Sequence, residues 1–139
     1  MVISKSAVAN IFSHARETAP HECCGLLIGS GDVVERIVRA ANADSRPTRY
    51  LIDPADHFSA IRFAREDGLD VIGAYHSHPA SAAIPSPTDI AEAHNGPDFL
   101  YLIVSLADED VRAYRVEDGR PIVVPIRNRR ARGSARSAS

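Results

Sequence analysis

Short apolar runs of strand length are the feature that most limits how this chain can fold. The longest, Phe-Leu-Tyr-Leu-Ile-Val at residues 99–104, is far shorter than the roughly 20 residues that a membrane-spanning helix needs. Similar runs at 23–29 (CCGLLIG) and 70–78 (DVIGAYHSH) also predict buried strands, the last of them near the centre of a sheet. The chain is therefore predicted to build its core around a β-sheet, with no segment in a membrane.

Two segments are predicted to form helices against this sheet. Residues 4–18 place apolar side chains at helical spacing and stop before Pro20. Residues 53–68 begin with an aspartate cap and a proline at the first helical position, and they end at Gly68. Both segments are long enough to cover part of a sheet face.

Further strands and a short third helix complete the predicted order of elements. The helix is expected from Ser86 through His94, where Asn-Gly-Pro stops it. The last strand contains prolines, which suit the margin of a sheet. Besides the strands at 23–29 and 70–78, we expect strands at 33–43, 49–53, 99–107, 111–119 and 121–127. The predicted fold class is α/β, one domain with a mixed, mostly antiparallel sheet flanked by helices.

The composition is that of a soluble globular protein. The 139 residues fit one ordinary domain, with a hydrophobic fraction of 45% and a charged fraction of 24%. Charged and polar residues are scattered through the N-terminus, which does not resemble a secretory signal, so a cytoplasmic location is predicted. Cys23 and Cys24 would point to opposite faces of a strand, and we expect two reduced thiols rather than a disulfide.

Basic charge is concentrated at the C-terminus of the chain. Residues 127–139 contain five of the 16 basic residues and no acidic residue, which leaves 11 basic against 18 acidic residues in the rest. A segment of Arg, Ser, Ala and Gly is typical of a solvated, disordered terminus, although it can also contact nucleic acid or an acidic partner. We expect a basic, disordered tail and no nucleic-acid partner.

Residues 73–90, GAYHSHPASAAIPSPTDI, contain the candidate functional residues. On one interpretation, His76 and His78 are surface side chains, and Ser86 and Asp89 form a capping box at a helix start. On the other, the two histidines share one side of a strand, and a proline-rich loop returns Asp89 to the end of that strand. Two imidazoles and a carboxylate with an open fourth position are the ligands of a catalytic zinc site. Both interpretations can hold at Ser86, which can cap the helix and still present its hydroxyl to the site.

The stretch HSHPASAAIPSPTD resembles the JAMM motif of the MPN-domain metalloproteases. That motif is His-x-His-Pro, six residues, Ser, two residues, Asp, and this chain matches it at every defined position. The family also has a glutamate in an N-terminal strand before a small apolar run, where this chain has Glu22 in HECCGLLIG. A less specific sequence similarity to the family covers most of residues 3–126. The resemblance implies a single MPN domain over residues 1–126, with sheet and helices layered as in cytidine deaminases, followed by the tail at 127–139.

The resemblance also implies a zinc-dependent hydrolase. One Zn²⁺ per chain would be bound by His76, His78 and Asp89. Glu22 would carry a proton from the attacking water to the leaving amine, and Ser86 would donate a hydrogen bond to the oxyanion. The implied substrate is a ubiquitin-like protein, cleaved at the peptide or isopeptide bond after its C-terminal Gly-Gly. The chain looks too short for the insertions by which eukaryotic relatives grip ubiquitin. It is more similar to compact bacterial members that process sulfur carrier proteins, some of which release cysteine from a carrier.

Three other functions are weighed against this one. A non-catalytic MPN scaffold would have lost metal ligands, whereas all three are present. A zinc deaminase of related architecture would need His-x-Glu followed by Pro-Cys-x-x-Cys, which this chain does not have. A JAMM-like protein associated with nucleic acid would use the arginine-rich tail. The sequence leaves open whether the chain forms a homodimer.

Overall fold

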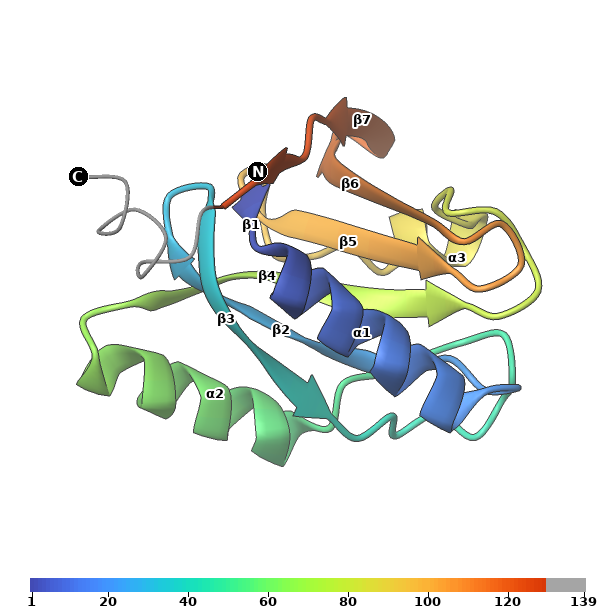
Figure 1. The fold of residues 1–139 in the computed structure, drawn as a ribbon, viewed down its shortest axis with the longest axis horizontal. Helices are drawn as coiled ribbons and strands as arrows, with labels where there is room; N and C mark the ends of the chain where they lie inside the picture. Colours follow the sequence, from blue (N-terminus) through green and yellow to red (C-terminus); the bar gives the residue numbers. More distant parts are fainter. Residues whose placement is uncertain (130–139) are drawn as a thin grey trace.

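The computed structural model describes residues 1–129, which form one eight-stranded sheet and three helices (Figure 1). Residues 130–139 lie outside the described part of the chain. The helices are α1 (Lys5–Thr18), α2 (Pro54–Glu66) and α3 (Pro87–Ala91). The strands are β1 (Val2–Ile3), β2 (Cys24–Ser30), β3 (Val33–Ala40), β4 (Asp70–His78), β5 (Leu100–Ser105), β6 (Asp110–Glu117), β7 (Arg120–Val124) and β8 (Arg127–Asn128). The predicted α/β architecture is confirmed.

β4 lies in the middle of the sheet, whose strand order is β7-β6-β5-β4-β2-β3-β1-β8. It pairs antiparallel with β2 and parallel with β5. The pairs β1–β3 and β1–β8 are also parallel, and the remaining neighbours are antiparallel. The mixed, mostly antiparallel sheet is therefore as predicted, and it holds the C-terminal end of β4 between two long strands.

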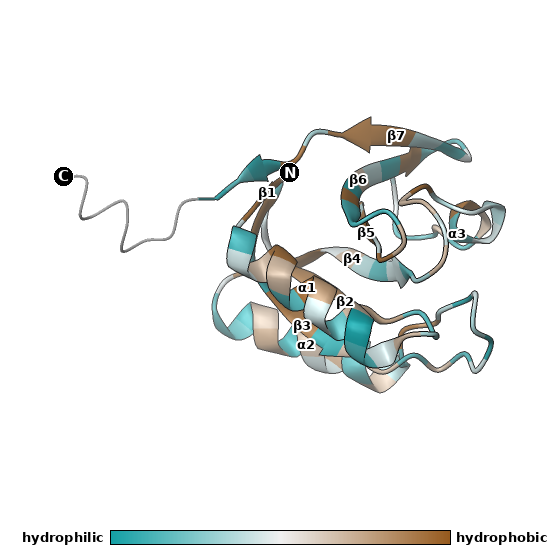
Figure 2. Cartoon of the chain, turned by 45° about the vertical axis from the view of Figure 1, so that its right-hand side comes forward, coloured by the Kyte–Doolittle hydropathy of each residue, from teal (hydrophilic) through white to brown (hydrophobic). Residues whose placement is uncertain are grey.

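The two long helices cover opposite faces of this sheet. α1 buries Ile11 and Ala15 in the larger apolar cluster, which includes Tyr75 of β4. α2 buries Ala60 and Ala64 in a second cluster on the other face. Figure 2 shows hydrophobic colour along the strands and a mixture of hydrophilic and hydrophobic residues along both helices, as expected for helices with one buried side. None of the helices within residues 1–129 is long and apolar enough to cross a membrane.

Both long helices start where the sequence predicts. The Ser4 hydroxyl accepts the Ala7 N–H (3.1 Å) at the start of α1. The Asp53 carboxylate accepts the Ala55 N–H (2.8 Å) at the start of α2, where Pro54 takes the first position. These caps satisfy backbone donors that have no partner within the helix.

The strand predicted at 49–53 is wrong, because only Ile52 forms an isolated bridge, with Asn42. The Asn42 side chain forms hydrogen bonds with the backbone of this segment. Its Oδ1 accepts the Leu51 N–H (2.9 Å), and its Nδ2 donates to the Arg49 carbonyl (3.0 Å). Two backbone hydrogen bonds join the same segments, from the Ala43 N–H to the Leu51 carbonyl (2.7 Å) and from the Asp53 N–H to the Ala41 carbonyl (3.0 Å). The segment is therefore a loop held by these bonds and by the Asn42 side chain, and it carries Tyr50 over the end of β4.

The third helix is shorter than predicted, ending at Ala91 instead of His94. The backbone N–H of Glu92 bonds to the Thr88 carbonyl and closes the helix. The chain then turns through Gly96, whose φ of 89° favours glycine. The helix nevertheless keeps the first turn that carries Asp89.

Two short strands were not predicted, and one of them lies in the expected tail. The Arg127 N–H bonds to the Met1 carbonyl (2.8 Å), so β8 extends the sheet beyond β1. Arg129 forms an ion pair with Glu35 (2.6 Å). The sheet thus continues past the predicted boundary at residue 126, and the rest of the predicted tail lies outside the described residues.

Candidate metal centre

Three donor atoms meet at the C-terminal end of β4. His76 and His78 are two apart on this strand, so their side chains leave it on the same side. Their Nε2 atoms are 3.1 Å apart, and each is also 3.1 Å from Oδ2 of Asp89. Both histidines are buried, with exposed fractions of 2% and 5%. The predicted convergence of the three residues is therefore present in the fold.

A capping box holds Asp89 in this position. The Ser86 hydroxyl accepts the Asp89 N–H (3.0 Å), and the Asp89 carboxylate accepts the Ser86 N–H (2.9 Å). Because both bonds are present, Ser86 caps α3 and at the same time fixes the rotation of the Asp89 side chain. The two interpretations are therefore compatible at Ser86, whereas the interpretation of His76 and His78 as surface side chains is wrong, because both are buried.

The rings of both histidines are fixed by neighbours that the sequence analysis did not identify. His78 Nδ1 lies 2.8 Å from the Ala82 carbonyl, which can only accept, so this nitrogen carries the proton. In the neutral ring, Nε2 of His78 then presents a lone pair to the centre. Tyr50 stacks on His76 with ring centroids 4.3 Å apart and an interplanar angle of 20°.

The electrostatics of the three residues differ. Burial alone would lower the pKa of His78, but hydrogen bonds with Asp89 and the Ala82 carbonyl outweigh it and raise that pKa. Burial lowers the pKa of His76 and so favours its neutral form. Burial alone would raise the pKa of Asp89, but hydrogen bonds with His76 and His78 outweigh it and hold that pKa well below its usual range. Asp89 is thus a carboxylate facing two imidazole nitrogens.

Glu22 completes the group from the N-terminal side of β2. One ligand atom each of Glu22, His76, His78 and Asp89 lies within 4.8 Å of all the others. The Glu22 side chain is 5% exposed, and its Oε1 has no hydrogen-bond partner among the described residues. Burial raises its pKa to about 7. A carboxyl group with that pKa can both accept and release a proton near neutral pH.

The donor set fits a tetrahedral metal ion. Edges of 3.1 Å are close to the roughly 3.3 Å that separates ligands around zinc with bonds of about 2.0 Å. When both Nε2 atoms are unprotonated, as metal ligands must be, two nitrogen lone pairs and a carboxylate face one another and repel unless a cation lies between them. The Glu22 carboxyl group, one oxygen of which has no partner, lies within 4.8 Å of these three donor atoms. The group is therefore suited to one divalent cation with an open position.

The remaining histidines and cysteines lie outside this group. His14 bonds through Nδ1 to the Tyr75 hydroxyl (2.7 Å) on the other face of the sheet, and His21 is exposed. Cys23 and Cys24 are buried and free. Burial raises the pKa of Cys23 to about 11 and that of Cys24 to about 12. The prediction of two thiols without a disulfide between them is confirmed.

Comparison with known proteins identifies the family to which this fold and this donor set belong. Residues 4–117 match the sequence model described as prokaryotic homologs of the JAB domain. The chain belongs to this family, the JAB or MPN domains, as the motif in residues 76–89 predicts.

Three similar proteins illustrate the match. The "CysO-cysteine peptidase" of Mycobacterium tuberculosis is 37% identical over 132 residues, covering 91% of this chain and 89% of that protein. The "Probable TtuB-protein conjugate cleaving protease" of Thermus thermophilus is 33% identical over 115 residues, covering 82% and 74%. The solution structure of protein DSY2949 from Desulfitobacterium hafniense superposes with a TM-score of 0.86 at 31% identity, covering 94% and 93%. The similarity therefore extends over most of the length of each protein.

Proposed function

We propose that this protein is a zinc-dependent hydrolase that cleaves the peptide or isopeptide bond after the C-terminal Gly-Gly of a ubiquitin-like sulfur carrier protein. The observation that carries the proposal is the donor triangle of His76, His78 and Asp89 beside the buried, unpartnered carboxyl group of Glu22. The relatives named as a CysO-cysteine peptidase and a protease of TtuB-protein conjugates support this class of substrate.

His76, His78 and Asp89 would hold the zinc ion, and Glu22 and Ser86 would serve the reaction. When bound, zinc polarises the scissile carbonyl and lowers the pKa of its water to about 7. Glu22 would accept a proton from the attacking water and deliver it to the departing amine, a role that suits a carboxyl group whose pKa is about 7. Its burial away from other donors keeps it free for this transfer.

Ser86 would stabilise the oxyanion of the tetrahedral intermediate. Its hydroxyl oxygen accepts the Asp89 N–H, so the hydroxyl proton remains available for donation. Losing one such donor typically costs about 3 kcal/mol of transition-state stabilisation. The capping bond thus orients the hydroxyl for a second task.

A Gly-Gly tail suits the substrate side of this reaction. Only residues without side chains let an extended chain approach the buried end of β4 closely. A carrier that ends in Gly-Gly and is joined to cysteine, or to a protein amine, would present the scissile carbonyl there. The free, buried Cys23 and Cys24 are consistent with the reducing cytoplasm, in which we place the reaction.

Metal content and turnover together test the proposal. Protein purified without added zinc should contain about one zinc per chain by inductively coupled plasma mass spectrometry, and His78→Ala should lose it. The zinc-loaded protein should cleave a carrier–Gly-Gly–cysteine conjugate, and Glu22→Gln should retain zinc but not turnover. Absence of zinc after reconstitution, or equal turnover by Glu22→Gln, would contradict the proposal.

A further inference from the structure

A pocket of about 300 Å³ opens on the same face of the sheet as the metal centre. Its floor is one row of residues across three strands, where Leu26 of β2 and Tyr101 of β5 both pair with Ala74 of β4. His76 is two positions further along β4 on the same face. The pocket and the metal centre are therefore built on neighbouring rows of residues, about 7 Å apart along β4.

The loop that covers the metal centre also forms a wall of this pocket. Tyr50 lines the pocket and stacks on His76, so its ring separates the two spaces. Ile52 adds apolar surface from the same loop, and Phe99 faces it from the segment before β5. Phe99 contacts the Tyr101 ring edge-on, with centroids 5.3 Å apart. The pocket is thus bounded mainly by apolar and aromatic side chains.

One polar atom in the pocket has no partner. Tyr101 is 8% exposed, and its hydroxyl makes no hydrogen bond among the described residues. A buried hydroxyl without a partner costs free energy, and such groups in folded proteins usually have one. Tyr114, two strands from β4, shows the usual situation, because its hydroxyl donates to the Ala83 carbonyl (2.6 Å). The Tyr101 hydroxyl therefore lacks a hydrogen-bond acceptor, which a ligand that enters the pocket would supply.

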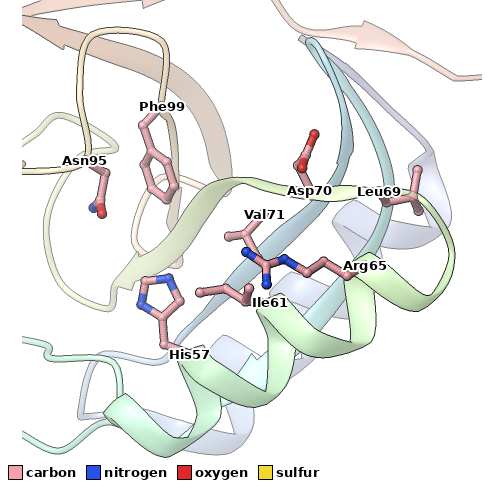
Figure 3. A pocket seen from close by; sticks show the side chains of 8 residues that line it. All are labelled: His57, Ile61, Arg65, Leu69, Asp70, Val71, Asn95 and Phe99. Carbon is pink, nitrogen blue, oxygen red and sulfur yellow. The ribbon is translucent and has the colours of Figure 1, made fainter.

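A second pocket continues the first along β4, away from the metal centre. Figure 3 shows it between α2 and β4, with His57 and Phe99 at one end and Arg65 and Asp70 toward the other. His57, Asn95 and Phe99 line both pockets. The two spaces are consecutive, so an extended chain that leaves the metal centre along this face meets the first pocket and then the second.

We propose that the first pocket receives the side chain of the residue that precedes the Gly-Gly of the substrate tail, and that this side chain is a bulky aliphatic one. This inference rests on the proposed function above. An extended chain rises about 3.3 Å per residue, so two glycines reach from the metal centre to the row of Ala74, about 7 Å away. The third residue from the scissile bond then faces the pocket between Tyr50 and Phe99.

The pocket's chemistry selects this occupant. Its volume is at the lower end of the range for small-molecule sites, which suits one side chain rather than a cofactor. Leu26, Ile52 and Phe99 offer apolar contact, and no lysine or arginine lines the space. A backbone carbonyl of the tail would accept the hydrogen bond from the Tyr101 hydroxyl. Glu92 also lines the space, but its carboxylate is already paired with Arg49, so a charged residue at this position of the tail would lose its hydration without a free partner.

Cleavage of two synthetic probes by the zinc-loaded full chain tests the proposal. Leu-Gly-Gly-aminomethylcoumarin should be cleaved with a kcat/KM at least about tenfold above that of the Ala-Gly-Gly probe. Tyr101→Phe, which removes only the unpartnered hydroxyl, should raise KM for the Leu probe about threefold to tenfold. Asn95→Trp, placed at the exposed rim, should remove the preference for Leu by filling the pocket.

A binding measurement and a matched tyrosine control separate this proposal from the hydrolase itself. The tripeptide Leu-Gly-Gly should shift the amide resonances of Asn95, Phe99 and Tyr101 in ¹⁵N-labelled protein, and Ala-Gly-Gly should not. Tyr75→Phe, which alters a tyrosine on the opposite face, should leave the Leu preference intact.

Each combination of results decides one proposal or both. Equal cleavage of the two probes, with no shifts at these residues, would overturn the pocket and leave the hydrolase standing. Shifts without cleavage of either probe would support the pocket and contradict the hydrolase. Neither shifts nor cleavage would overturn both.

Discussion

The two faces of β4 differ in how completely their polar atoms are paired. On the α1 face, the Tyr75 hydroxyl bonds to His14 Nδ1 (2.7 Å), and the Ser77 hydroxyl accepts the Cys23 N–H (2.8 Å). Tyr75 and Ser77 are fully buried there. The same strand thus has one face on which buried polar groups have protein partners.

The opposite face leaves polar atoms without partners. Glu22 Oε1 beside the metal centre and the Tyr101 hydroxyl in the neighbouring pocket make no hydrogen bond among the described residues. The Nε2 atoms of His76 and His78 lie 3.1 Å from each other and from Asp89 Oδ2, so three donor atoms converge on one point. Because alternate residues of one strand build both faces, the difference does not come from the backbone. Within residues 1–129, Arg115 Nε of β6 is also unpaired on the α1 face, so the contrast applies to the end of β4 and its neighbours and not to the whole sheet. At that end, unpaired buried atoms mark the side that is shaped for something bound from outside.

The largest expected effect is on turnover and comes from the unpaired face. Glu22→Gln should lower kcat about 10²- to 10⁴-fold, because it removes the group that transfers the proton. The melting temperature should not fall, since a neutral amide replaces a buried carboxyl group that has no partner. Thermal unfolding followed by circular dichroism, beside a turnover assay, checks both halves. A variant that lost stability and activity together would break the distinction between the faces.

The next effect is on stability and comes from the paired face. A Cβ at Gly25 would lie 2.1 Å from the Tyr75 ring, which is fully buried under α1. Gly25→Ala should therefore lower the free energy of unfolding by about 1–3 kcal/mol, the usual cost of overpacking a core. Urea unfolding measures this change, with Ser30→Ala at the exposed end of β2 as a control expected to stay within about 0.5 kcal/mol. A neutral result at Gly25 would show that this face is less tightly packed than its contacts indicate.

A smaller effect is expected where a single hydrogen bond is removed from the paired face. Tyr75→Phe keeps the ring and deletes the bond to His14, so unfolding should become easier by about 0.5–1.5 kcal/mol. Tyr101→Phe on the other face deletes a hydroxyl that has no partner and should be neutral or stabilising. Equal losses in the two variants, measured by urea unfolding, would show that the Tyr101 hydroxyl is paired in solution.

The sequence predicts the metal centre better than its surroundings, and for a physical reason. His76, His78 and Asp89 are placed by strand alternation and by the first turn of a capped helix, which are local rules. Tyr50 reaches His76 from a loop whose shape depends on the Asn42 side chain, a tertiary contact with no periodic pattern. The apolar residues of that loop favoured a strand, but the fold pairs its backbone partly with residues 41–43 and partly with the Asn42 side chain, which leaves only an isolated bridge.

The fold shows the same division between local and distant causes. The long helices and central strands follow from apolar periodicity and capping residues, which are visible within about 15 residues of sequence. β1 and β8 are two residues each and exist because distant ends of the chain lie side by side. No local pattern distinguishes such short strands from loop. The absence of partners at Glu22 and Tyr101 is likewise a property of the assembled fold and cannot be read from either segment.

The smallest expected effect is a pH dependence of stability that arises on the paired face. Burial lowers the pKa of His14, and Arg39 nearby lowers it further, against the opposing charge of Glu17. The unfolded chain, whose histidine has a pKa near 6.5, therefore binds more protons than the folded one as the pH falls below that value. His14 should thus make the protein less stable between about pH 6.5 and the lower pKa of the folded state, and it should contribute nothing above this window. The unfolding free energies of the original chain and of His14→Gln can be compared by urea titration at pH 8 and pH 5.5. Relative to the original chain, the variant should be more stable at pH 5.5 than at pH 8. A difference that does not change with pH would mean that His14 is solvated and that the pairing of this face stops short of α1.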